Sequence, residues 1–116
     1  MVKTRTSTLG AASNVVTGTY TGDGAATQAI IGLGFQPKYV FVYPQVDNVT
    51  RNPAQKTDLD GLFSLLFILG TSSWSAYLLD HIISLDADGF TVGDGTGSGG
   101  NALNINGRVY TYIAFG

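Results

Sequence analysis

The feature of this sequence that most constrains its fold is the run Arg108–Phe115 (RVYTYIAF), which lies at the very end of the chain. Valine, threonine, isoleucine and phenylalanine alternate in it with tyrosine and alanine, so both sides of an extended strand are largely apolar. Strands with two apolar faces are typical of sheet interiors. We therefore expect this run to be inserted centrally in a sheet, with both faces buried, and not to form a flexible tail.

Turn residues divide the rest of the chain into short strand-like runs. Lys38–Tyr43 (KYVFVY) is the clearest of them and is also expected in the interior. The length of Leu62–Leu69 (LFSLLFIL) favours a buried strand, although its periodicity also allows a short core helix. A helix within Ser75–Ser84 is the main alternative to strands further along. The remaining expected strands are Asn14–Thr21, Gln28–Gly32, Ser73–Leu79, His81–Leu85, Gly89–Gly93 and Leu103–Asn106.

Composition favours the same all-β fold class. The eight acidic residues are all aspartate, which favours turns, whereas glutamate favours helices. About eight short strands bounded by glycine and aspartate predict a single antiparallel β-sandwich, jelly-roll-like, over residues 14–116. Residues 1–13 are polar and predict a flexible, extended N-terminal arm, which is either frayed or ordered on a neighbouring subunit. The polar segment Gln45–Asp60 predicts a long surface loop.

Several classes of chemistry lack the residues that they require. The formal charge is only −2, so we expect no nucleic-acid partner. There is no cysteine for a disulfide or a thiolate site, and the single histidine, His81, cannot form a multi-histidine metal site. We expect His81 to be partly exposed on a strand or to line a symmetry axis. No secretory leader or membrane-length apolar run is present, so we expect synthesis in the cytoplasm and no membrane partner.

Two glycine and aspartate motifs resemble ligand sites but lack their context. Residues 95–100 (GTGSGG) match the dinucleotide pattern G-x-G-x-x-G, yet they are followed by another strand-like run, and a hairpin loop explains them better. Asp86, Asp88 and Asp94 could form a calcium site, but the glutamate of an EF-hand is missing. Turn capping by these carboxylates is the simpler explanation. We expect no cofactor and no catalytic site.

The aromatic residues allow two interpretations. Trp74 and Tyr77 lie close together in the sequence and could form a stacking platform for sugar rings. The stronger alternative is ordinary core burial, because aromatic residues are favoured in strands and supply much of the buried area of a small domain.

Four segments carry a resemblance to a known group of proteins. They are GTYTGDG at 18–24, GLGFQPKYVFV at 32–42, ISLDADGFTVG at 83–93 and NINGRVYTYIAF at 104–115. In this order they resemble small β domains of tailed-bacteriophage virion proteins, which occur in tail fibres and as stand-alone surface proteins. The resemblance covers about residues 16–116. It implies a β fold and brings no catalytic residues with it.

The resemblance implies a non-enzymatic structural protein of the phage particle. Because the chain begins at a methionine and shows no shaft or adaptor region, a capsid decoration or cement protein on the virion surface is favoured. The alternative is a carbohydrate- or receptor-binding module of a tail fibre or head fibre. Expected partners are the major capsid protein or another virion protein, and further copies of this chain, with a trimer favoured. The expected contact residues are Lys3, Arg5, Arg51 and Lys56, since most basic residues lie in the arm and the polar loop.

Overall fold

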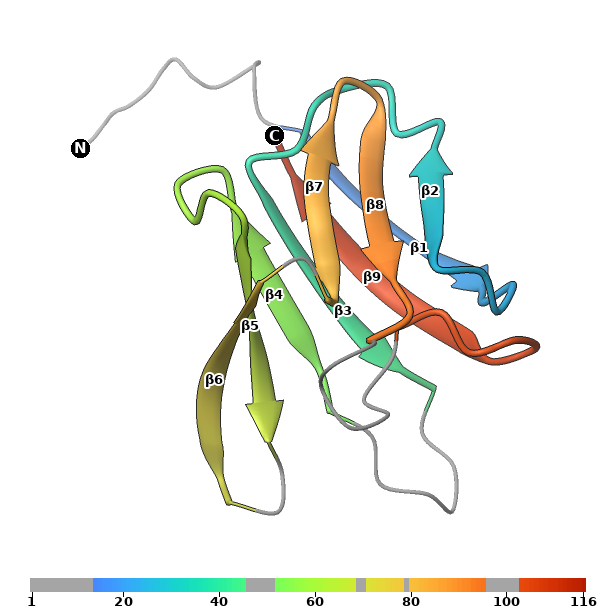
Figure 1. Cartoon of the computed structure of the whole chain (residues 1–116). Coiled ribbons are helices and arrows are strands. Elements are labelled where there is room, and N and C mark those ends of the chain that lie inside the picture. The colour runs from blue at the N-terminus through green and yellow to red at the C-terminus, as the bar shows by residue number, and fades with distance from the viewer. Residues whose placement is uncertain (1–13, 46–51, 69–70, 79, 96–102) are drawn as a thin grey trace.

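The computed structural model describes residues 14–45, 52–68, 71–78, 80–95 and 103–116, and these form two antiparallel sheets (Figure 1). No described residue is helical, so the predicted all-β sandwich is confirmed and the helical alternatives for the fifth and sixth strands are wrong. The strands are β1 (Val15–Thr21), β2 (Thr27–Ile31), β3 (Tyr39–Pro44), β4 (Ala54–Thr57), β5 (Phe63–Ile68), β6 (Ser73–Leu78), β7 (Ile82–Asp86), β8 (Gly89–Gly93) and β9 (Val109–Phe115).

The last strand is central in the larger sheet, as its sequence predicts. The six-stranded sheet has the order β1-β9-β3-β4-β5-β6, so β9 pairs with β1 on one side and with β3 on the other. The three-stranded sheet has the order β2-β8-β7. It lies against one face of the large sheet, where β7 also contacts β4 and β5, and the lower ends of β5 and β6 extend beyond it (Figure 1).

The core lies between the two sheets and is built around aromatic rings. Tyr20 of β1 stacks on Tyr110 of β9 with ring centroids 5.1 Å apart, and Phe90 of β8 meets Tyr112 edge to face at 5.1 Å. Stacked and edge-to-face pairs add to the free energy gained from burying the rings. The other buried apolar residues are Ile30, Leu33, Val40, Val42, Ala54, Leu66, Ile82, Val92, Leu103 and Ala114.

Asp88 joins the β7–β8 turn to the segment that follows β2. Its two carboxylate oxygens accept hydrogen bonds from the backbone N–H groups of Gly32 (3.0 Å) and Gly34 (2.7 Å). Both glycines have positive φ angles, of 90° and 86°. This backbone conformation is unfavourable for a residue that has a side chain. Turn capping is therefore the role of this aspartate, and the turn it caps lies far away in the sequence.

Two sequence predictions about irregular segments are wrong. The expected loop Gln45–Asp60 contains β4, whose Ala54 and Lys56 point into the structure although the segment is polar. Its residues 46–51 lie outside the described residues. The expected strand Leu103–Asn106 is a turn-containing segment without strand pairing. Asn104 instead bonds the β1–β2 turn, since its side-chain amide donates to Ala25 O at 2.9 Å and to an Asp23 carboxylate oxygen at 2.7 Å.

We expect alkaline pH to destabilise the fold through the buried tyrosines. Burial raises the pKa of Tyr20, with a further contribution from Tyr110, and burial also raises the pKa of Tyr110. These groups stay protonated in the folded chain while the unfolded chain ionises, so their stabilising contribution is complete below pH 10 and is lost above it. The expected loss is about 1.4 kcal/mol per pH unit for each strongly shifted tyrosine.

Urea unfolding followed by circular dichroism between pH 8 and pH 11 measures this loss. Tyr20→Phe is the matched variant: it removes one titrating group together with the hydrogen bond that Tyr20 Oη donates to Leu103 O. The variant should be less stable at pH 8 but should lose less stability per pH unit above 10. Equal slopes for the two proteins would contradict the assignment to Tyr20.

Candidate functional site

The most unusual surface of the molecule is the side of the six-stranded sheet that faces away from the small sheet, here called the outer face. Side chains alternate between the two sides of a strand, so this face is set by the paired registers of its strands. Its members are Val15, Thr17, Thr19 and Thr21 of β1; Val109, Thr111, Ile113 and Phe115 of β9; Tyr39, Phe41 and Tyr43 of β3; Gln55 and Thr57 of β4; Phe63, Leu65 and Phe67 of β5; and Trp74, Ala76 and Leu78 of β6.

No member of the outer face carries a charge. The charged residues of the described chain lie in turns, at strand ends, in the small sheet or, for Lys56, on the inner side. Protein surfaces are ordinarily rich in charged side chains, whereas the centres of protein–protein interfaces lack charge and are enriched in aromatic residues. The outer face therefore has the composition of an interface.

The two central strands are not buried on both sides, and that prediction is wrong. In β3 and β9 fully buried residues alternate with partly buried ones. Val40 and Ala114 face the small sheet and are inaccessible, while Phe41, Ile113 and Phe115 lie on the outer face, where Phe115 is 40% exposed. No described strand packs over this side (Figure 1). The second apolar side of these strands is thus available to a partner.

Aromatic side chains pack against one another across the middle of the outer face. Tyr39 lies beside Phe115 with ring centroids 5.8 Å apart, and Phe41 lies beside Tyr43 at 5.8 Å. The Tyr39 hydroxyl donates to Gln55 Oε1 at 2.7 Å, and partial burial raises the pKa of Tyr39. These contacts hold the rings in place before any partner binds, which reduces the entropy cost of binding.

The β5–β6 hairpin separates the two aromatic residues that could have formed a sugar platform. Trp74 is on the outer face, packed edge to face on Phe67 at 5.1 Å. Tyr77 lies three residues after Trp74, so its side chain points to the opposite side of β6. There the centroid of its ring lies 5.0 Å from that of His81. The weaker of the two interpretations, one Trp74–Tyr77 platform, is therefore wrong, and the favoured one, core burial, does not hold for Trp74, which is 44% exposed. His81 is fully buried, so the expectation of partial exposure is wrong as well.

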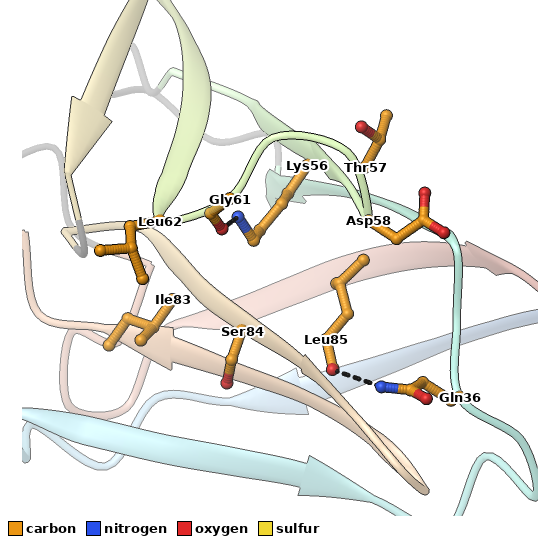
Figure 2. Close-up of a pocket in the computed structure, with 9 residues that line it drawn as sticks. All are labelled: Gln36, Lys56, Thr57, Asp58, Gly61, Leu62, Ile83, Ser84 and Leu85. Carbon is orange, nitrogen blue, oxygen red and sulfur yellow. Dashed lines mark hydrogen bonds between the residues drawn. The ribbon is translucent and has the colours of Figure 1, made fainter.

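Lys56 lines a pocket of about 270 Å³ between the β4–β5 turn and β7 (Figure 2). Its ammonium group donates to Gly61 O and Phe63 O, both at 2.6 Å, and the residue is only 3% exposed. Desolvation lowers the pKa of Lys56, and the Asp60 carboxylate opposes this shift. The expectation of an exposed contact lysine is therefore wrong. The Lys56 ammonium group is buried and bonded to carbonyl groups of the β4–β5 turn and the start of β5.

Two further polar residues of the pocket lining are also engaged within the protein. Gln36 donates from its side-chain amide to Leu85 O at 3.0 Å across one end of the pocket (Figure 2). The Ser84 hydroxyl, which also lines the pocket, donates to an Asp86 carboxylate oxygen at 2.7 Å. The side chains of Gln36, Lys56 and Ser84 in the pocket lining are therefore already bonded within the protein.

Two of the three carboxylates considered for calcium, those of Asp86 and Asp88, bind other groups. The second oxygen of Asp86 accepts from Thr91 Oγ1 at 2.7 Å, and both oxygens of Asp88 accept from backbone N–H groups. Within the described ranges, no three metal-binding side chains gather at one point. Of the glycine motif at 95–100, only Gly95 is described, and it has a φ of 72°.

The other predicted contact residues, Lys3, Arg5 and Arg51, lie outside the described residues, so their role stays a prediction. The described part of the chain contains no helix that is long and apolar enough to cross a membrane. Comparisons with family models, curated proteins and solved structures gave no match.

Proposed function

We propose that this protein is a non-enzymatic structural protein of a bacteriophage particle, a decoration or cement protein that binds the virion surface through its outer face. The observation that carries the proposal is the uncharged, aromatic outer face, which no described strand covers. The sequence resemblance to virion surface domains supplies the setting. The expected partner is the major capsid protein or another virion protein that presents an uncharged, apolar surface.

The outer face is large enough for binding to rest on its contact area and not on a few single residues. Six strands about 4.8 Å apart and about 20 Å long give a projected area on the order of 500 Å². A standard interface takes ~800 Å² of accessible surface from each partner, so this face is of the order that one side of an interface needs. Repetition at many equivalent sites of a particle would add to the effect of each contact.

The receptor-binding alternative has less support. It requires a sugar platform, and Trp74 and Tyr77 lie on opposite sides of β6. A glycan array tests this alternative directly. A reproducible sugar signal that Trp74→Ala abolishes would favour the receptor-binding function over particle decoration.

The outer-face proposal predicts a large loss of binding for Phe41→Asp. Phe41 lies in a central strand, beside Tyr43, so the new carboxylate would be placed in the middle of the contact. An unpaired charge in a dry interface removes more binding energy than a lost side chain does. We expect at least a roughly 100-fold weaker association with capsids assembled from the major capsid protein of the same phage, measured by co-sedimentation.

Ile31→Asp is the matched control, because Ile31 is a strongly exposed apolar residue of β2 in the small sheet. It should leave capsid binding unchanged, and circular dichroism should show both variants folded. Undiminished binding of a folded Phe41→Asp variant would remove the outer face from the contact. If the unmodified protein does not bind capsids at all, the decoration function itself is wrong.

A further inference from the structure

β6 is an edge strand of the large sheet and lacks the features that normally protect such edges. Natural edge strands carry charges, prolines or bulges that prevent pairing with another chain. The sequence of β6, SWSAYL, contains neither charge nor proline, and its pairing with β5 runs without a register shift. Two of its apolar side chains are well exposed, Trp74 at 44% and Leu78 at 50%. An edge of this kind is a template for another strand.

The direction of the backbone groups in β6 follows from one hydrogen bond in β5. Phe67 N donates to Pro53 O at 2.9 Å, which is on the β4 side. Alternate residues of a strand direct their N–H and C=O groups to opposite edges. The neighbours of Phe67 in β5, among them Leu66, therefore direct their groups toward β6.

The partners of these β5 residues in β6 use their backbone groups inside the subunit. Leu66 pairs with Ser75, and Ser64 pairs with Tyr77. The intervening residues must direct their N–H and C=O groups outward, to the free edge of the sheet. These residues are Trp74, Ala76 and Leu78.

We propose that a second copy of this chain pairs with β6 along this edge, antiparallel and around a two-fold axis at Ala76. In this register Ala76 faces Ala76 of the second copy, and Trp74 faces Leu78 of the second copy on both sides of the axis. All the outward backbone groups of β6 then exchange hydrogen bonds across the interface. Each exposed apolar side chain of β6 gains an apolar cross-strand neighbour, while the small side chain sits on the axis.

A second copy fits this edge better than a charged partner does. The described residues of β6 and of its neighbour β5 carry no charge, so two copies of a chain with a net charge of −2 can meet here without close like-charge contacts. The opposite edge, β1, fits less well. Its outward residues include Thr17 and Thr19, which offer Trp74 and Leu78 less apolar surface.

The pairing gives one twelve-stranded sheet from two six-stranded ones. Because the two-fold axis is perpendicular to the sheet, both outer faces lie on the same side and form one continuous uncharged surface. This inference does not depend on the proposed function, since pairing along β6 needs no particle. A contact limited to one strand of about 20 Å is small, so we expect a reversible dimer with a dissociation constant on the order of 10 μM.

Ala76→Pro tests the pairing with little disturbance to the subunit. Proline removes the outward N–H group at the axis and is tolerated where an edge-strand N–H faces solvent. Sedimentation velocity between about 1 and 200 μM should show a monomer–dimer equilibrium for the unmodified chain, and at least a tenfold weaker association for the variant. Circular dichroism and thermal unfolding check that the subunit is folded.

Thr19→Pro is the matched control at the other edge. Gly116 N donates to Asn14 O, so even-numbered β1 residues bond to β9 and Thr19 directs its N–H group outward. This variant should dimerise like the unmodified chain. A trimer, the oligomer expected from the sequence, that both prolines weaken would instead indicate ring contacts between β6 and β1 and would overturn the two-fold pairing.

A cysteine variant keeps the proposal testable if the proline disturbs folding. The chain contains no cysteine, so Ala76→Cys introduces a single thiol at the axis. Paired residues there would bring their Cα atoms to about 5.5 Å, within the range that a disulfide spans. Mild oxidation should give a covalent dimer in high yield for Ala76→Cys and little for Thr19→Cys. A monomeric unmodified chain at 200 μM, or no difference between the cysteine variants, would refute the pairing.

Discussion

Tyr110→Ala should strongly destabilise the folded state. Tyr110 is fully buried in β9, the strand that joins β1 to the other four strands of the large sheet, and its ring stacks on that of Tyr20. Replacing a large buried aromatic residue with alanine costs about 3–5 kcal/mol, out of a total stability of about 5–15 kcal/mol for a domain. We expect the thermal unfolding midpoint to fall by about 15 °C or more in a circular dichroism melt.

Tyr110→Phe separates the ring from its hydroxyl. The Tyr110 hydroxyl accepts a hydrogen bond from Ile105 N at 3.1 Å, so the phenylalanine variant keeps the stacking and loses this bond. The expected cost is about 1 kcal/mol. Similar losses for the two variants would mean that the hydroxyl, and not the buried ring, provides the stability.

Gly89→Ala should be nearly as damaging, although it adds a single methyl group. A Cβ atom at Gly89 would lie 1.8 Å from Ile30 O, a backbone atom of the neighbouring β2 strand. Neither strand can shift without breaking its own pairing in the small sheet. We expect a loss of more than ~3 kcal/mol, because overpacking against backbone leaves no rotamer that relieves the contact. Urea unfolding monitored by tyrosine and tryptophan fluorescence measures it.

Gly34→Ala is the contrasting variant for this prediction. Its φ of 86° strains any side chain, yet a Cβ atom there would meet no atom within 4 Å. Only the backbone strain remains, at about 1–2 kcal/mol. If Gly34→Ala proves more harmful than Gly89→Ala, backbone conformation, and not close approach of the strands, dominates at these glycines.

Most of the strands could be predicted from the sequence, because short apolar runs between glycine and aspartate turns form few structures other than strands. β3, β8 and β9 lie close to their expected ranges. β4 was missed because its sequence, AQKT, is polar. Its inward side chains are Ala54 and Lys56, and the ammonium group of Lys56 is satisfied by two carbonyl groups of the next turn. A lysine that buries its stem in this way leaves no apolar alternation in the sequence.

The outer face could not be recognised from single strands. A strand side that faces a core and one that faces a partner have the same apolar composition, so Phe41 and Phe115 were assigned to the interior. The distinction depends on the number of layers: the described chain has a single second sheet, which covers only one side of the large sheet. The sequence does contain more apolar strand faces than a domain of this size can bury, and this excess is a signal of an interface. Only the topology shows which strand faces are left uncovered.

The central place of β9 also determines when the protein can fold during its synthesis. β1 and β3 both pair with β9, and no strand pair joins them directly to each other. Each therefore presents an open edge to solvent until residues 109–115 have left the ribosome. A nascent chain that stalls before this point keeps two unpaired, β-prone edges in solution, where they can pair with other chains. Ribosome stalling or premature release should therefore yield aggregates, and not partly folded subunits.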